Sequence, residues 1–458
     1  MANGYFVSGK KDEIAYFDLF FRRTPDKGGF AIAAGLEQVI NYIKNLRFSQ
    51  KDIDFLRKKG LFSENFLEYL RDFRFTGDIW AVPEGTPVFP NEPILTVRAP
   101  ALEAQFIETY LLLAINHQTL IATKANRIVR AAAGRGVMEF GTRRAQGADA
   151  AVLGARAAYI GGVRQSACTI ADARFGVPAT GTMAHSWIQM FDSEYEAFKT
   201  YCEIYPNNAT LLVDTYHTLE SGVPNAIRAF KETGLTRCAI RIDSGDLAYL
   251  SRKARAMLDE AGLPFCRIVV SNSLDEYLIG KLIEQGACID AFGVGERLIT
   301  AKSDPVLGGV YKLSAVEKEG MIIPKIKISD NPEKITNPHF KKVWRLYEQG
   351  KAVADLLTLY DETVTTDRPL VIFDPQHTWK RKTLTEFEAK ELLVPIFKNG
   401  EAVYESPSLS EIASYCDEQV ALLWDEVKRF DNPHNYYVDL SQNLWDLRQD
   451  MLKDKHKI

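Results

Sequence analysis

The histidine at position 185 has the clearest chemical setting of the seven in the chain. It follows a β-rich run and the pair Gly181-Thr182, and we expect it in the first turn of a helix through residues 187–198. A helix N-terminus favours a neutral, nucleophilic imidazole and offers N–H donors to a phosphoryl group. His185 is therefore predicted to be a phosphorylatable nucleophile.

An arginine and two aspartates form a second candidate group, within Arg241-Ile242-Asp243-Ser244-Gly245-Asp246. Side chains two positions apart on a strand share a face, so Arg241 and Asp243 should lie side by side. We expect Asp243 to reach a ribose or a magnesium ion, while Asp246 caps the following helix. Capping alone would explain Asp246, but it would not explain the Arg241/Asp243 pair.

Tandem arginines follow an aromatic residue in Phe140-Gly141-Thr142-Arg143-Arg144. Neighbouring side chains on an extended segment point to opposite faces, so only one of Arg143 and Arg144 should enter a site. A guanidinium matches a carboxylate bidentately, which suits an anionic substrate. An interior ion pair is the alternative interpretation.

Donors for phosphate are expected after two further apolar runs. Asn272 and the loop of Gly293 and Gly295 can present backbone N–H groups at helix N-termini, although such loops are also simple turns. Asp214 ends another apolar run. Together these residues suit a polyphosphorylated substrate.

Short apolar runs that alternate with amphipathic helix patterns must position these residues. About seven βα units follow one another without a break, which favours an α/β fold with an irregular barrel over an open sheet. The active site is then expected at the carboxyl ends of the strands. The expected strand ends are 137–140, 158–161, 177–180, 211–214, 239–243, 267–270 and 289–293.

Three regions are expected around this pattern. Residues 1–108 mix helix patterns with proline-punctuated strand patterns, which predicts an N-terminal α/β domain, completed by about 305–366. Residues 109–304 are assigned to the irregular βα barrel that carries the active site. Residues 367–458 are expected to form a helical C-terminal accessory extension.

Composition points to a folded enzyme that acts on small molecules in the cytoplasm. The 56 Lys+Arg and 60 Asp+Glu residues give a net charge of −4, which provides no general attraction to nucleic acid or to a membrane. The six cysteines show no metal-binding spacing and are expected to be reduced thiols. The sequence shows no signal peptide and no apolar run near the roughly 20 residues that cross a bilayer.

Four motifs in one order resemble the nicotinate phosphoribosyltransferase family, especially its bacterial branch. The likeness runs from about residue 4 to residue 342. The motifs are Glu139-Phe140-Gly141-Thr142-Arg143-Arg144-Ala145-Gln146-Gly147, Gly181-Thr182-Met183-Ala184-His185-Ser186, Arg241-Ile242-Asp243-Ser244-Gly245-Asp246 and Gly308-Gly309-Val310-Tyr311-Lys312-Leu313.

This resemblance implies an enzyme of NAD biosynthesis that joins nicotinate to phosphoribosyl pyrophosphate, with ATP as co-substrate and Mg²⁺ carried by the pyrophosphate. It also implies a homodimer with shared active sites, in which ATP phosphorylates His185. By the same likeness, Phe140 would stack on the pyridine ring, Arg143, Thr182 and Arg241 would hold the nicotinate side, Asp243 the ribose, and Gly293, Gly295 and Thr336 the phosphate.

Two positions depart from the family pattern. The family usually has glycine after Lys334-Ile335-Thr336-Asn337-Pro338, where this chain has His339, and this weakens the assignment of Thr336. In the family, a short segment with an aromatic residue precedes the stretch in which Met1 of this chain lies. Without that segment we expect weaker nicotinate binding, and equal Michaelis constants after its restoration would contradict this.

Alternatives from three classes stay open. A related phosphoribosyltransferase could act on nicotinamide or quinolinate, although a quinolinate enzyme should be shorter and richer in basic residues. A phosphate-binding barrel aldolase or isomerase should show a Schiff-base lysine or a carboxylate base at a strand end, and no strand end here shows such a lysine. A catalytically silent nucleotide sensor would keep its binding and cellular role after His185→Ala.

Overall fold

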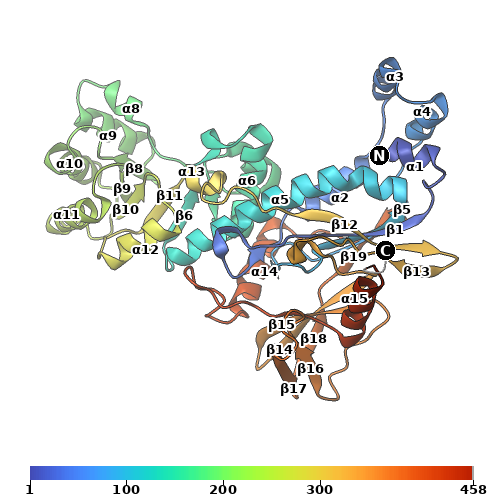
Figure 1. Cartoon of the computed structure of the whole chain (residues 1–458). Coiled ribbons are helices and arrows are strands. Elements are labelled where there is room, and N and C mark those ends of the chain that lie inside the picture. The colour runs from blue at the N-terminus through green and yellow to red at the C-terminus, as the bar shows by residue number, and fades with distance from the viewer. Residues whose placement is uncertain (456–458) are drawn as a thin grey trace. The chain divides into compact units, whose positions relative to one another are not determined.

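The computed structural model describes residues 1–455 (Figure 1). The chain folds into two compact units, one built from Met1–Leu120 with Val306–Ile458 and the other from Ile121–Pro305. The long helix α5 (Ala101–Ala131) contributes residues to both units. No helix of the described part combines the length and the apolar character that crossing a membrane requires.

The first unit contains a seven-stranded antiparallel sheet that brings distant segments together. Strand β1 (Ile14–Phe20) pairs on one side with β5 (Leu95–Pro100) and on the other with β12 (Val310–Lys318). Residues beyond position 305 therefore supply a strand beside β1. The remaining strands are β3 (Asp78–Ala81), β13 (Met321–Pro324), β19 (Val394–Lys398) and β20 (Glu401–Ala402).

Helices α2 (Leu36–Asn45), α3 (Gln50–Lys59) and α4 (Glu64–Arg71) lie between β1 and β3 along the chain. Helix α3 begins at a capping box, in which Ser49 and Asp52 satisfy each other's backbone N–H groups. The apolar faces of α3 and α4 pack with the start of α5. Ile53, Phe66, Leu67, Leu70, Phe73 and Leu102 form this buried cluster.

The C-terminal part of the first unit contains strands as well as helices. Strands β14 (Lys341–Glu348), β15 (Lys351–Leu359), β18 (Glu388–Glu391) and β21 (Val438–Leu440) form a four-stranded sheet. The prediction of a helical extension after residue 366 is therefore not confirmed, although two helices are present. They are α14 (Leu409–Ala421) and α15 (Gln442–Lys455).

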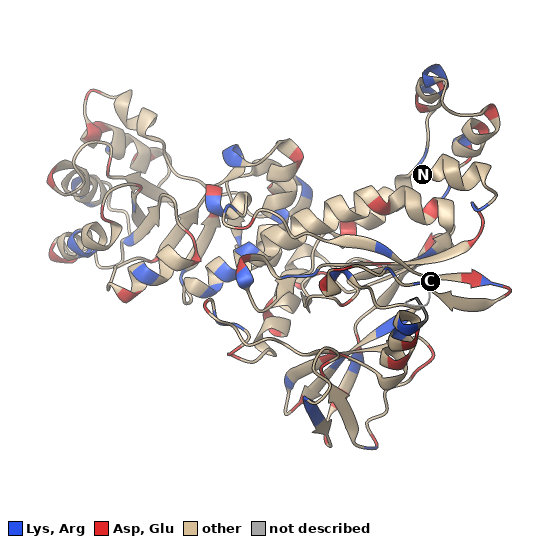
Figure 2. Ribbon diagram, in the orientation of Figure 1, with Lys and Arg blue, Asp and Glu red and all other residues tan. Residues whose placement is uncertain are grey.

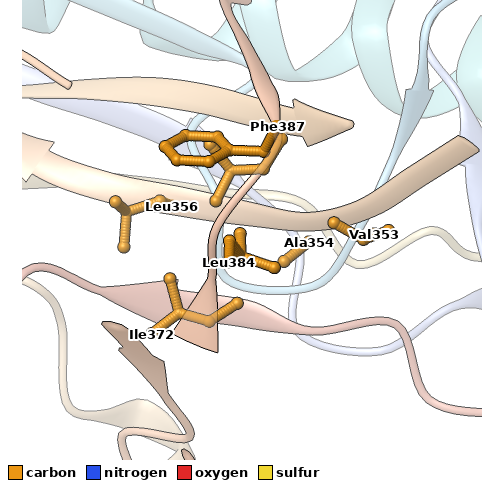
Figure 3. Close-up of a cluster of buried hydrophobic side chains, with 7 residues drawn as sticks. Val353, Ala354, Leu356, Ile372, Leu384 and Phe387 are labelled. Atoms are coloured by element: carbon orange, nitrogen blue, oxygen red, sulfur yellow. The ribbon is translucent and has the colours of Figure 1, made fainter. Parts of the chain in front are cut away.

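A hairpin of β16 (Leu370–Phe373) and β17 (Arg381–Leu384) belongs to the same region. Its side chains Ile372 and Leu384 pack against Leu356 of β15 and against Phe387 (Figure 3). Burial of apolar side chains from both elements supplies the free energy that holds the hairpin in place.

The second unit contains six parallel strands in the order β7-β6-β11-β10-β9-β8. Parallel neighbours require a crossover segment, and the chain supplies a helix between most of them. All carboxyl ends of the strands meet at one edge of the sheet, which is the edge that the sequence predicts for the site. The strands are β6 (Gly136–Glu139), β7 (Gln165–Ser166), β8 (Ala209–Leu212), β9 (Cys238–Ile242), β10 (Arg267–Ser271) and β11 (Ala291–Val294).

The predicted seven-unit barrel is not confirmed, because the parallel sheet curls into a half-barrel. Five of the seven expected runs are strands, but residues 158–161 lie at the end of helix α6 (Ala148–Ile160). A short apolar run such as this one fits the end of a helix as well as a strand, and Ala158 continues the alanine-rich sequence of α6. Residues 177–180 contribute only an isolated bridge between Ser166 and Ala179.

The helix expected through residues 187–198 is interrupted. Helix α8 (His185–Gln189) ends early, and α9 (Glu194–Ile204) begins after Ser193, whose hydroxyl accepts from Glu196 N. The apolar pattern runs through both helices, but the Ser193 cap starts a new one. Helices α10 (Val223–Thr233), α11 (Leu247–Glu260) and α12 (Glu276–Glu284) complete the crossovers.

Candidate active site

His185 is the first residue of helix α8, as its sequence position predicts. Its Nδ1 atom lies 3.0 Å from Oγ1 of Thr215. Its Nε2 atom lies 4.0 Å from Oδ2 of Asp243, and 42% of its side chain is exposed. The imidazole therefore sits between a hydroxyl and a carboxylate, and a ligand from solvent can reach it.

The guanidinium of Arg241 donates a hydrogen bond from each of its three nitrogens. Nε donates to Ser271 Oγ at 2.8 Å, Nη1 to Thr182 Oγ1 at 2.7 Å, and Nη2 to Asp243 Oδ1 at 2.9 Å. The Ser271 hydroxyl also donates to the same carboxylate oxygen. The predicted pairing of Arg241 with Asp243 is confirmed, and the planar fork of the arginine joins three segments of the chain.

The Asp214 carboxylate ties the end of β8 to the end of β9. Its Oδ2 atom accepts from Asp243 N at 3.0 Å and from Ser244 Oγ at 2.6 Å. Its Oδ1 atom is buried and has no hydrogen-bond partner among the described residues. A buried carboxylate oxygen without a donor is unfavourable, so a bound cation or ligand hydroxyl would stabilise it.

Phe140 follows β6 and packs against β11. The Arg241 guanidinium lies over its ring, 5.4 Å from the ring centre. A Cβ atom on Gly293 would lie 2.6 Å from Cδ2 of the Phe140 ring, so only glycine leaves room for the aromatic side chain there. One face of the Phe140 ring therefore lies against the Arg241 guanidinium, and one edge lies against strand β11.

Glu139, which is fully buried, holds the loop after Phe140 by hydrogen bonds. The Glu139 carboxylate accepts from Gly141 N, from Ser166 Oγ at 2.6 Å and from Thr142 Oγ1 at 3.4 Å. Burial raises the pKa of this carboxyl, and the hydrogen bonds to its charged form act in the opposite direction. These bonds fix the backbone that carries Phe140.

Arg143 and Arg144 lie in a 3₁₀ turn (Thr142–Arg144) and are both exposed. The prediction that they alternate on an extended segment is wrong, because successive side chains in such a turn are about 120° apart. Arg144 lies close enough to Glu296 to contribute, after Lys302, to the lowered pKa of the Glu296 carboxyl.

The three other predicted binding residues of this unit differ in their setting. Asn272 follows β10 with φ 98°, but helix α12 begins only after Asp275, so Asn272 is not at a helix N-terminus. Gly295 is the N-terminal cap of the short helix α13 (Glu296–Ile299). Asp246 caps α11 by accepting from Tyr249 N at 3.0 Å.

Thr336 belongs to the other unit. It is buried, and its hydroxyl accepts from Lys327 N at 3.2 Å. Its assignment to the phosphate stays a prediction. His339 has φ 74°, a left-handed conformation that favours glycine, and this explains why a glycine pattern would be expected after Pro338.

Three hydroxyl side chains of the site were not assigned a role from the sequence. Thr215 contacts His185, Ser271 bridges Arg241 and Asp243, and Ser244 contacts Asp214. Each lies at the carboxyl end of a strand or just beyond it, and this position is the sequence signal that could have identified them. Serine and threonine are so frequent in turns that position alone does not separate them from ordinary loop residues.

Asp214 and Asp243 are the candidate ligands for a metal ion in this site. Among residues 1–455, no group of three or more histidine, cysteine, aspartate or glutamate side chains is arranged as a metal site. Mg²⁺ commonly takes one or two carboxylates together with waters and substrate phosphates. Asp214 and Asp243 are joined by a hydrogen bond, and the unpartnered Asp214 Oδ1 fits that mode of binding.

Basic and acidic residues are interspersed over the chain (Figure 2). The outer helices carry both signs, for example in the pairs Arg228–Glu232 and Arg255–Asp259. Neighbouring charges of opposite sign on these helices give a polyanion little net attraction to them. The charges that matter for a small ligand are therefore those at the strand ends.

Three family models match the chain along most of its length. They describe the nicotinate phosphoribosyltransferase N-terminal domain at residues 1–116, the nicotinate phosphoribosyltransferase family at 136–362 and the corresponding C-terminal domain at 340–448. The matches cover both structural units, including the strand ends described above.

Individual relatives agree with these models. Nicotinate phosphoribosyltransferase of Bacillus subtilis (strain 168) is 47% identical over 449 residues, which cover 97% of this chain and 91% of the relative. The Homo sapiens enzyme of the same name is 31% identical over 506 residues, with 97% and 93% coverage.

A crystal structure of human nicotinic acid phosphoribosyltransferase superposes with a TM-score of 0.85. It has 28% sequence identity and covers 99% of this chain and 98% of that chain. The chain belongs to the nicotinate phosphoribosyltransferase family.

Proposed function

We propose that this chain joins nicotinate to phosphoribosyl pyrophosphate, forming nicotinate mononucleotide and pyrophosphate for NAD biosynthesis, with ATP hydrolysis coupled to the reaction. Membership of the family supports the enzyme class and the two substrates. The observation that carries the proposal is the hydrogen-bonded group of Thr182, Arg241, Asp243 and Ser271, with His185 beside it. It places a cation, a carboxylate and an imidazole at one edge of the parallel sheet.

The nicotinate side of the site is assigned to Phe140, Arg143, Thr182 and Arg241. Phe140 stacks on the pyridine ring, and a guanidinium binds the carboxylate of nicotinate. Arg241 already donates to three neighbours, so it is held rigidly, whereas Arg143 is exposed. Arg143 is therefore the arginine that is free to turn toward the substrate carboxylate.

The ribose and phosphate side is assigned to residues at the other strand ends. Asp243 receives the ribose hydroxyls, and Asp214, which accepts a hydrogen bond from Asp243 N, is assigned to the same side of the site. Asp246 is a weaker candidate, because its carboxylate caps α11. Asn272, Gly293, Gly295 and Thr336 are assigned to the phosphate end.

Displacement of pyrophosphate passes through a state with positive charge on the ribose. The carboxylates of Asp243 and Asp214 stabilise this charge electrostatically. Mg²⁺ bound with the pyrophosphate would neutralise the leaving group, and Asp214 and Asp243 would hold it. The pyridine nitrogen attacks with its own lone pair, so no general base is required.

His185 is proposed as the residue that ATP phosphorylates. Its ring is accessible, and the Asp243 carboxylate lies 4.0 Å from its Nε2 atom. Transfer of the phosphoryl group back to water during the cycle couples ATP hydrolysis to mononucleotide formation. Further proposals are a homodimer with shared active sites and a cytoplasmic location, the latter because the cysteine spacing shows no disulfide framework.

The proposal is tested with purified protein, nicotinate, phosphoribosyl pyrophosphate and Mg²⁺, with and without ATP. Mononucleotide, ADP and pyrophosphate are followed together. We expect ADP and mononucleotide to appear in step, and His185→Ala to abolish ADP formation that depends on nicotinate. Absence of mononucleotide under all conditions would contradict the proposal.

Substrate choice is tested in the same assay. Nicotinamide lacks the negative charge that an arginine recognises, so it should compete poorly with nicotinate. Quinolinate carries a second carboxylate and should also be a poor substrate. Preferred use of either compound over nicotinate would assign the chain to one of the alternative phosphoribosyltransferase reactions.

A further inference from the structure

Two cysteines lie side by side at the amino end of the parallel sheet, opposite the edge that carries the candidate site. Cys238 is the first residue of β9, and β9 pairs in parallel with β10, where Ala239 lies opposite Arg267 (Figure 1). Cys266 directly precedes Arg267, and its thiol is hydrogen-bonded to that of Cys238. We propose that Cys238 and Cys266 form a reversible disulfide when the protein meets a hydroperoxide.

The spacing of the strands allows a disulfide at this position. Neighbouring strands lie about 4.8 Å apart, and a disulfide spans Cα separations of about 4.4–6.8 Å. Side chains at matching positions of parallel neighbours lie on the same face of a sheet. The two sulfur atoms can therefore be joined without a change in strand order or register.

Cys238 is the thiol that an oxidant reaches first. Of Cys238 7% is exposed and of Cys266 1%, while Arg237 and Phe265, which precede them in the sequence, are exposed. The pair thus lies just beneath the surface. A small neutral molecule such as hydrogen peroxide suits this setting better than a large disulfide reagent.

A fixed positive charge lies beside the pair. The Arg255 guanidinium of α11 donates from Nη1 to Cys266 O at 2.6 Å, from Nη2 to Leu263 O at 2.9 Å and from Nε to Asp259 Oδ1 at 2.8 Å. The hydrogen bond from Cys266, together with the Arg255 charge, lowers the pKa of the Cys238 thiol against the effect of burial. The thiolate is the reactive form of cysteine, so Cys238 is the attacking sulfur.

Cys266 provides the second sulfur. Its bond to Cys238 and its burial raise the pKa of its thiol, so it keeps its proton. The S–H group has Cys238 Sγ and, at 3.8 Å, Arg267 O as acceptors. A protonated and enclosed thiol reacts slowly with peroxide, but it stands beside Cys238 and can attack that sulfur once it is oxidised.

The oxidation takes two steps. The Cys238 thiolate attacks an oxygen of hydrogen peroxide, an S–O bond forms and the O–O bond breaks, and the departing hydroxide takes the proton that Cys238 had given to solvent. The Cys266 sulfur then attacks the sulfur of this sulfenic acid, an S–S bond forms, the S–O bond breaks, and hydroxide leaves as water with the Cys266 proton. Two thiols lose two electrons, and one peroxide becomes two molecules of water.

Cys202 of α9 is the competing partner for Cys238. Its negative form would interact with that of Cys238, so the two thiols are near each other. Burial raises the pKa of the Cys202 thiol to about 11, and its hydrogen bond is to Thr233. The thiol hydrogen-bonded to Cys238 is that of Cys266, which favours Cys266 as the disulfide partner.

The first test uses the native protein. It is treated with hydrogen peroxide and denatured in an alkylating reagent, and its peptides are mapped by mass spectrometry without reduction. We expect a peptide pair linked through Cys238 and Cys266, which disappears when the oxidised protein is treated with dithiothreitol before alkylation. Absence of this link, or a link from Cys238 to Cys202, would overturn the proposal.

The second test removes the resolving thiol. In Cys266→Ala the sulfenic acid at Cys238 has no partner, so further peroxide should convert it to sulfinic acid, which dithiothreitol does not reverse. We expect about tenfold more sulfinic acid at Cys238 than in the native protein after the same exposure. Cys288→Ala is the matched control, because Cys288 is a half-buried thiol outside the pair, and it should behave like the native protein. Equal amounts in Cys266→Ala and native protein would overturn the role of Cys266.

The two tests are independent of the proposed function. Neither uses nicotinate, phosphoribosyl pyrophosphate or ATP, so a chain that makes no mononucleotide could still form the disulfide. A chain that makes mononucleotide but shows no link between Cys238 and Cys266 would contradict only the disulfide. The first test remains decisive if Cys266→Ala fails to fold.

Discussion

Gly293 leaves the space that the ring of Phe140 occupies. A Cβ atom at Gly293 would lie 2.6 Å from Cδ2 and 2.7 Å from Cε2 of that ring, closer than carbon atoms approach without displacement. Strand β11, which carries Gly293, pairs directly with β6, which leads into Phe140. The position of the Phe140 ring therefore depends on the lack of a side chain at Gly293.

Gly293→Ala should displace the Phe140 ring and weaken stacking on the pyridine. We expect the Michaelis constant for nicotinate to rise about tenfold, because a stacked aromatic contact is worth about 0.5–1.5 kcal/mol and the ring must also move. Gly280→Ala is the control, since a Cβ atom there meets nothing within 4 Å. Equal Michaelis constants for native protein and Gly293→Ala would show that the ring does not contact nicotinate.

Arg241→Lys should lower kcat/KM by about a hundredfold, or ~2.7 kcal/mol of transition-state stabilisation. A lysine keeps the charge but cannot reach Ser271, Thr182 and Asp243 with the geometry of the guanidinium fork. Steady-state kinetics with nicotinate measure the loss. Arg267→Lys, on the exposed start of β10, is the matched control and should leave the kinetics unchanged. A loss below threefold in Arg241→Lys would contradict the proposed anchor.

His339→Gly should stabilise the protein. His339 adopts φ 74°, which costs a non-glycine residue about 1 kcal/mol, and glycine adopts it without that cost. The glycine variant loses the contact of Nδ1 with Phe340 O at 3.1 Å, so the net gain should be below 1 kcal/mol. Chemical denaturation measures the difference. His339→Ala removes the same ring and keeps the strained backbone, so it should be less stable than the glycine variant; the reverse order would contradict the argument.

Asp439 should make the stability of the protein depend on pH. Burial, with the nearby negative charge of Asp374, raises the pKa of its carboxyl from 3.8 to about 7 in the folded state. The folded state thus favours the neutral carboxyl, so its contribution is fully present below about pH 4 and is lost as the pH rises through about 7.

Asp439→Asn keeps a neutral side chain at every pH. We therefore expect the stability of the native protein relative to this variant to fall between pH 4 and pH 7, measured by denaturant unfolding across that range. Asp361→Asn, at an exposed position, provides the control and should follow the native curve. A constant difference between native protein and Asp439→Asn would show that the Asp439 carboxyl has the same pKa in the folded and unfolded states.

The local patterns predicted much of the parallel sheet and many of the residues at the carboxyl ends of its strands. Runs such as 239–243 and 267–270 are short, β-branched and bounded by polar residues, and they became β9 and β10. The Arg241/Asp243 pairing also followed from the sequence, because the two-residue repeat of a strand is a local property. The prediction of a strand at residues 158–161 is wrong, because an apolar run of four residues fits a helix end as well as a strand.

The sequence by itself determined most of the parallel strands with the residues at their carboxyl ends, and which family the motifs resemble, because both follow from spacing along the chain. Only the tertiary structure decided that Thr215 contacts His185, that Ser271 bridges Arg241 and Asp243, and that Gly293 makes room for Phe140. Each of these contacts joins different βα units. Their partners are set by strand order and register, which depend on the packing of the whole sheet and not on any local pattern.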